Sequence, residues 1–158
     1  MATEQETQFA LHGCASRCLL WLANHKQGAV HMTKAEFIDR YCLDYPSACA
    51  KGQCGGTDTG TMLEIAKMLG LANRLQVYRS PSRVRSHIER HETDVILAIT
   101  EKNDFIHCWI VVGQSKNPAR WQFAEVDDSI QTIPPMTVRD SELDLWSAYF
   151  CVFFLVGA

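Results

Sequence analysis

The chain has 158 residues, a formal net charge of -3 with its six histidines neutral, and 47% hydrophobic residues, which is typical of one ordinary globular domain. This balance excludes the basic surface that a nucleic-acid partner needs, and it excludes a polybasic membrane anchor. No stretch approaches the ~18 consecutive apolar residues of a membrane span.

The N-terminal segment MATEQETQFALHG is polar and lacks the basic start and apolar run of a secretory signal peptide. The seven cysteines are odd in number and irregular in spacing, which favours reduced thiols over a disulfide framework. We therefore expect a cytoplasmic protein, or one secreted by a route that needs no cleaved signal peptide.

Helical spacing dominates the first half of the chain. The segment that begins at Cys14, CASRCLLWLANHK, places apolar side chains on one stripe and predicts a helix. A second helix is expected from Thr33, which has the form of a capping box with Glu36. A third is expected in TMLEIAKMLG, where Thr61 and Glu64 have the same form.

The second half is rich in Val, Ile, Phe, Tyr and Trp, and turn residues separate its apolar runs, which is typical of strands. Strands are expected over residues 74–78, 94–100, 105–113, 120–128 and 148–156, with a short helix over 82–91. Short links imply antiparallel neighbours. We therefore predict an α+β fold in one domain, 1–158, with a helical part over about 1–72 and a sheet part over about 73–158.

The first candidate for chemistry is Cys14, which follows Gly13 and begins the first predicted helix. The unpaired N–H groups and the dipole at a helix start favour an anion, and a nearby imidazolium lowers the pKa of such a thiol further. The alternative is a small buried residue, because free cysteine is among the most buried types. Gln8 favours the nucleophile, since its side-chain N–H and the Cys14 backbone N–H can hold the oxyanion of a tetrahedral intermediate.

His107 is the candidate base. It lies in the apolar segment FIHCWIVVG, where the two-residue period of a strand places it on one face with Phe105, Trp109 and Val111. A lone histidine on such a strand is more often a core residue. Imidazole nevertheless titrates near neutrality and is costly to bury without a partner, so a partner is expected.

A carboxylate at the end of the next predicted strand can orient His107. Asp128 is favoured, because the period places it on a small, apolar face that suits a covered site. Asp127 is the alternative, and it shares its face with Glu125, whose charge is expected to prefer water. Both aspartates can also simply mark a solvated turn.

The order of these residues resembles the papain-like cysteine hydrolases. The resemblance rests on Gln8 and Cys14 in QFALHGCASRCLLWLA, on His107 in FIHCWIVVG and on the acid in FAEVDDS. In that superfamily the Gln supplies the oxyanion hole, the Cys attacks, the His is the base, and an Asn or Asp orients the His. The compact size and the last apolar strand are similar to bacteriocin-processing double-glycine peptidases and to secreted bacterial effector proteases and glutamine deamidases.

The resemblance implies a papain-like fold and a Cys-His-Asp triad that hydrolyses an amide of a protein or peptide, with no cofactor and no metal. A cysteine protease and a protein-glutamine deamidase are both compatible with these residues, and a secreted effector would act in virulence on a host protein. In the resting site, His107 and Cys14 are expected to form an imidazolium–thiolate pair.

Two other functional classes remain as alternatives: a binding module, and a regulator that uses thiol-redox chemistry or zinc. A papain-like binding module with a silent triad would carry the same residues. A thiol-redox regulator would use Cys18, one helical turn after Cys14, as a resolving thiol. A zinc regulator would use Cys42, Cys49 and Cys54, although their spacing lacks the Cys-x-x-Cys pairs of usual zinc sites.

Overall fold

The computed structural model describes residues 3, 6–7, 9–10, 13–42, 59–91, 95–103 and 105–156, without the side chains of residues 41, 42 and 105. The helices are α2 (Cys14–His25), α3 (Lys34–Phe37), the π-helix η1 (Ile38–Cys42), α4 (Thr59–Met68), α5 (Pro81–Arg90) and α6 (Asp140–Trp146). The strands are β1 (Arg74–Tyr78), β2 (Val95–Lys102), β3 (Phe105–Lys116), β4 (Ala119–Ala124), β5 (Met136–Arg139) and β6 (Ala148–Phe154).

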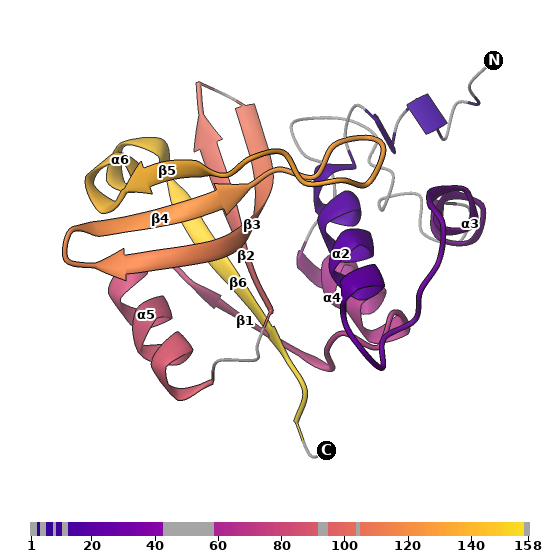
Figure 1. Ribbon diagram of the computed structural model, residues 1–158, viewed down its shortest axis with the longest axis horizontal. Helices are drawn as coiled ribbons and strands as arrows, with labels where there is room; N and C mark the ends of the chain where they lie inside the picture. The colour runs from indigo at the N-terminus through magenta and orange to yellow at the C-terminus, as the bar shows by residue number, and fades with distance from the viewer. Residues whose placement is uncertain are drawn as a thin grey trace.

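The strands form one six-stranded sheet in the order β1-β6-β2-β3-β4-β5. Every neighbouring pair is antiparallel, which confirms the α+β class and the antiparallel sheet (Figure 1). The strand that comes last in the sequence, β6, lies between β1 and β2.

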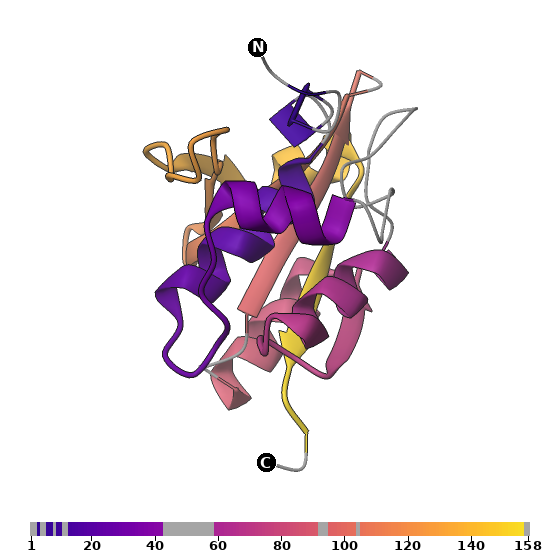
Figure 2. The same ribbon diagram turned by 90° about the vertical axis from the view of Figure 1, so that its right-hand side faces the viewer.

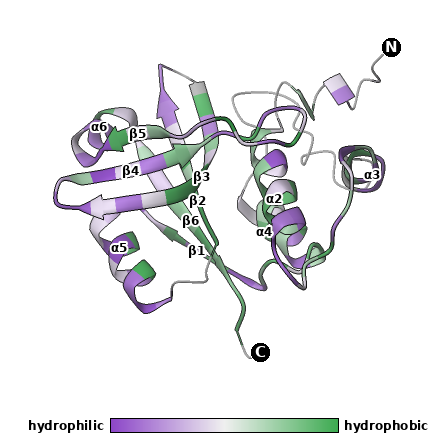
Figure 3. Cartoon of the chain, viewed as in Figure 1, coloured by the Kyte–Doolittle hydropathy of each residue, from purple (hydrophilic) through white to green (hydrophobic). Residues whose placement is uncertain are grey.

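The sheet has a hydrophobic core on each face. Along β6, Cys151 and Phe153 belong to one core, while Phe150 and Val152 belong to the other, as the two-residue period of a strand requires. The first core is covered by α2, α3 and α4, and Figure 2 views the molecule from that side. The second is covered by α5 and α6 (Figure 1). Hydrophobic residues accordingly follow the central strands in Figure 3.

All three helices predicted in the first half are present, and the starts of the first two are confirmed. The first helix begins at Cys14, and α3 follows Thr33, whose hydroxyl accepts the Glu36 N–H at 3.1 Å in a capping box. The third helix begins earlier than predicted, because α4 starts at Thr59 and Thr61 lies inside its first turn. Thr61 is therefore not an N-cap. In the described chain, no helix has the length and apolar character to cross a membrane.

The predicted strands are confirmed in place but differ in length. The strand expected to reach residue 128 ends at Ala124, because Asp127 closes a turn instead: its N–H donates to Gln131 O at 2.9 Å, and its carbonyl accepts from Ile130 at 3.0 Å. Strand β3 is longer than predicted and continues to Lys116. The sequence patterns did not predict β5 and α6 at all.

A buried ion pair holds the second core together. Arg85 of α5 donates to both carboxylate oxygens of Asp140 in α6, at 2.6 and 2.7 Å. Its Nε donates to Gln114 Oε1 of β3 at 2.9 Å, and its guanidinium lies 4.6 Å from the centre of the buried Trp121 ring in β4. One side chain therefore ties together two helices and two strands.

Asp140→Ala should destabilise the fold strongly, because it leaves the Arg85 guanidinium buried without its counter-charge. Loss of one partner of a buried pair typically costs about 3–5 kcal/mol. The free energy of unfolding, measured by urea denaturation, checks this. The control is Asp144→Ala in the same helix, where the aspartate is exposed and a change within about 0.5 kcal/mol is expected. Equal losses in the two variants would contradict the role of the pair.

Candidate active site

Gly13 places Cys14 at the start of α2. The Gly13 N–H donates to Phe9 O at 2.9 Å, and a Cβ at this position would lie only 2.5 Å from the same oxygen. Only glycine therefore fits between the preceding segment and the helix. The prediction that Cys14, directly after Gly13, begins a helix is confirmed.

The Cys14 thiol lies against the backbone of β3. The Cys108 N–H lies near enough to the thiol to lower its pKa, and one turn later the Cys18 thiol donates to Cys108 O at 3.7 Å. Cys108 faces Ile99 of β2 on one side, and the pairing of β3 with β4 reaches only Ile110. Cys14 packs against the first core near this end of the β3–β4 pairing.

His107, the residue before Cys108, is buried and lies 3.2 Å through Nε2 from Glu125 Oε1. Its ring contacts the Trp109 ring edge-on, with centroids 4.6 Å apart, so the two side chains share one face of β3 as predicted. Opposite His107 on β2 lies Thr100, whose hydroxyl accepts from Trp109 Nε1 at 2.8 Å. The imidazole is thus held between a carboxylate and an indole, one residue along the strand from the thiol contact.

The structure does not pair His107 with the two aspartates that the sequence favoured. The Asp128 carboxylate, half exposed, accepts from Lys34 Nζ at 2.9 Å. The Asp127 carboxylate closes its turn by accepting the backbone N–H groups of Ser129 and Gln131 at 3.0 and 3.1 Å.

Glu125 contacts His107 instead, because strand β4 ends at Ala124, the residue before Glu125. The Glu125 side chain keeps 36% of its surface exposed, so its charge stays partly in water while one oxygen reaches the imidazole. The strand period had assigned Glu125 to solvent on the assumption that the strand runs on to Asp128. Gln8, the predicted oxyanion donor, lies outside the described residues.

Arg17 is a buried residue of the site that the sequence patterns missed. From α2 it donates to three backbone carbonyls, Val126 O at 2.9 Å, Phe9 O at 2.8 Å and Ala10 O at 3.1 Å. Its positive charge lowers the pKa of Cys14, although burial outweighs it there. The spacing of Arg17 from Cys14 within the helix, on the otherwise apolar side, was the available signal.

Burial decides the protonation of both candidate catalytic groups. Burial raises the pKa of the Cys14 thiol above its ordinary value of 9.0, against smaller opposite effects of the Cys108 N–H and the Arg17 charge. Burial lowers the pKa of His107 below its ordinary 6.5, although the Glu125 charge opposes the shift. Both directions favour a neutral thiol and a neutral imidazole at rest over the expected imidazolium–thiolate pair.

Two other described thiols, Cys108 and Cys151, are buried. Burial raises the pKa of Cys108 well above 9.0 and raises that of Cys151 to about 12. Of the predicted zinc ligands, Cys49 and Cys54 lie outside the described residues, as does the side chain of Cys42. Within the described ranges, no three metal-ligating side chains come together.

Comparison with known proteins adds no relative. No family model matches the chain, and neither the curated proteins nor the solved structures contain a significant match.

Glu125→Gln should lower the pKa of His107 further, because the carboxylate charge favours the imidazolium. NMR titration of the histidine ring signals measures this, with the exposed Glu89→Gln in α5 as the control. An unchanged or raised His107 pKa in Glu125→Gln would contradict the assigned contact.

The same shift gives the stability of the fold a defined pH dependence. A histidine with a lowered folded pKa binds fewer protons in the folded state, so its contribution is complete above about 6.5 and is lost as pH falls toward the folded pKa. In Glu125→Gln this window should extend to lower pH. Urea denaturation between pH 5 and 7.5 is the measurement, with His107→Gln expected to remove this component.

Proposed function

We propose that the chain is a cysteine-nucleophile amide hydrolase with a papain-like arrangement, in which Cys14 attacks, His107 is the base and Glu125 orients the base. One observation carries the proposal. The thiol of Cys14, at a helix start, lies near the backbone N–H of Cys108, and the adjacent His107 has a carboxylate 3.2 Å from its Nε2. These contacts support a nucleophile, a base and an orienting acid close to the point where β3 leaves β4.

The reaction proposed for this site begins from neutral groups. Because Glu125 lies at Nε2, the thiol proton goes to Nδ1 of His107 as the Cys14 sulfur bonds to the carbonyl carbon. The oxyanion is held by the Cys14 backbone N–H, with Gln8 as the second proposed donor. His107 then protonates the departing nitrogen, the C–N bond breaks, and a water activated by the same imidazole hydrolyses the thioester.

Glu125 has the role that the sequence had given to an aspartate. The proton transfer turns His107 into an imidazolium inside a buried site, where burial disfavours that charge. The charge of the carboxylate at 3.2 Å from Nε2 opposes this effect. We propose a Cys14-His107-Glu125 triad, with the amide of a protein or peptide as substrate.

The test is acyl transfer to Cys14 from the activated ester p-nitrophenyl acetate at pH 7, followed by intact mass and peptide mapping. Acetylation is expected at Cys14 before any other cysteine. His107→Ala should slow it about 10²–10⁴-fold, the usual contribution of a general base. Glu125→Gln should slow it less, and Cys18→Ser, the matched thiol one turn further along α2, should acetylate at the unaltered rate.

Two outcomes would overturn the proposal: Cys14 acetylation that does not depend on His107, or acetylation of Cys18 at the same rate. The first result would leave the interpretation of a silent binding module.

If the acetylation of Cys14 depends on His107, incubation with protein substrates separates the two amide reactions by intact mass. A protease gives fragments, whereas a deamidase leaves one chain with an acid in place of an amide.

A further inference from the structure

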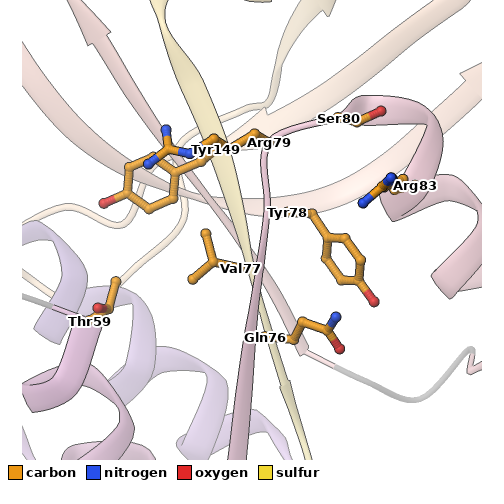
Figure 4. Close-up of a pocket in the computed structure, with 8 residues that line it drawn as sticks. All are labelled: Thr59, Gln76, Val77, Tyr78, Arg79, Ser80, Arg83 and Tyr149. Carbon is orange, nitrogen blue, oxygen red and sulfur yellow. The ribbon is translucent and has the colours of Figure 1, made fainter.

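A cavity of about 1020 Å³ lies at the edge strand β1, away from the candidate triad. Side chains from both faces of β1 line it (Figure 4). On one side of the strand lie Val77, Arg79 and Tyr149, and on the other lie Gln76, Tyr78 and Arg83. The space therefore extends around the edge of the sheet and is not restricted to one face.

Strand β1 is the outermost strand at this end of the sheet, and within the described ranges its ladder partner is β6 alone. The outer side of an edge strand presents backbone N–H and C=O groups to a further strand. An extended peptide that pairs there sends successive side chains to opposite faces. A cavity that is open on both faces of β1 has the shape that such a peptide requires.

The positive charge of the cavity favours a peptide that carries carboxylates. Arg79 and Arg83 are both exposed, one on each side of β1, and the Arg79 guanidinium lies 5.5 Å from the centre of the Tyr149 ring. Residues 74–91 contain five arginines and one glutamate; Arg85 is paired with Asp140, and the others leave a formal charge of +3 with the histidines neutral, whereas the whole chain carries -3. Carboxylates are the natural partners of exposed guanidinium groups at an interface.

The position of the cavity relates it to the candidate triad. Cys108 faces Ile99 across the sheet, and Ile99 faces Tyr149, so these three residues form one row on the face of the first core, whereas His107 lies on the opposite face with Trp109. Neighbouring strands lie about 4.8 Å apart, so Tyr149 is roughly 10 Å from Cys108. That distance corresponds to about three residues of extended chain.

We propose that β1 binds an extended acidic segment of a partner protein by strand addition, with carboxylates on adjacent residues reaching Arg79 and Arg83. This binding does not rest on the proposed function.

The experiment uses the full chain carrying Cys14→Ala, so that binding is measured without chemistry. The probe is a fluorescein-labelled peptide Thr-Val-Glu-Glu-Val-Thr, whose neighbouring glutamates point to opposite faces of a strand. Fluorescence anisotropy should show saturable binding. Arg79→Glu and Arg83→Glu should each weaken it at least about tenfold, and Arg120→Glu, an exposed arginine of β4, should leave it within about twofold.

Two altered peptides separate the carboxylates from the main chain. The Gln-Gln peptide should bind at least about tenfold more weakly, and N-methylation of alternate amides should weaken binding in the one register that removes the hydrogen bonds to β1. Equal binding of the parent and both N-methylated peptides would overturn strand addition. Equal weakening by Arg120→Glu, or no binding of the parent peptide, would overturn the site. The p-nitrophenyl acetate reaction involves neither arginine, so its result tests the triad separately.

Discussion

The guanidinium of Arg17 is the contact on which the candidate site depends. It satisfies three carbonyls that belong to the segment before α2 and to the chain after β4. A buried cation is tolerated only when such acceptors surround it, so the three segments cannot move independently. The start of α2, with Cys14, is thereby fixed against Val126, the residue that follows Glu125. The nucleophile and the carboxylate come from distant parts of the sequence, and this one side chain sets their separation.

Burial shifts the pKa values of Cys14 and His107 in opposite directions, and each shift favours the neutral group. It keeps Cys14 and His107 neutral at rest, which protects the thiol from oxidation and alkylation, because the thiolate is the reactive form. Glu125 opposes the effect of burial on the imidazole alone.

Local patterns in the sequence predicted what depends on local forces. The helix from Cys14, the capping box at Thr33 and the antiparallel strands all follow from periodicity and backbone chemistry. The partner of His107 did not, because it depends on where β4 stops, and a turn closed by the Asp127 carboxylate decides that. The alternation of side chains predicts which face a residue occupies only while the residue belongs to a paired strand.

Other features that the sequence patterns missed also depend on distant contacts. The short strand β5 and helix α6 are held by the rest of the sheet and by the pair of Arg85 with Asp140, which lie far apart in the sequence. Arg17 has a polar side chain on a buried helix face, and its acceptors could not be assigned without the positions of Phe9 and Val126. The function of the site stays a prediction for the same reason: it depends on distances between segments.

The strand order affects how the chain must fold as it is synthesised. Strand β6 lies between β1 and β2, yet it is translated after every other strand. A nascent chain on the ribosome therefore carries β1 and the β2–β5 meander with two inner edges unpaired until β6 leaves the exit tunnel. Both cores take residues from β6, so neither closes earlier. The sheet is therefore completed only after β6 has been synthesised, and until then its unpaired edges are open to other strands.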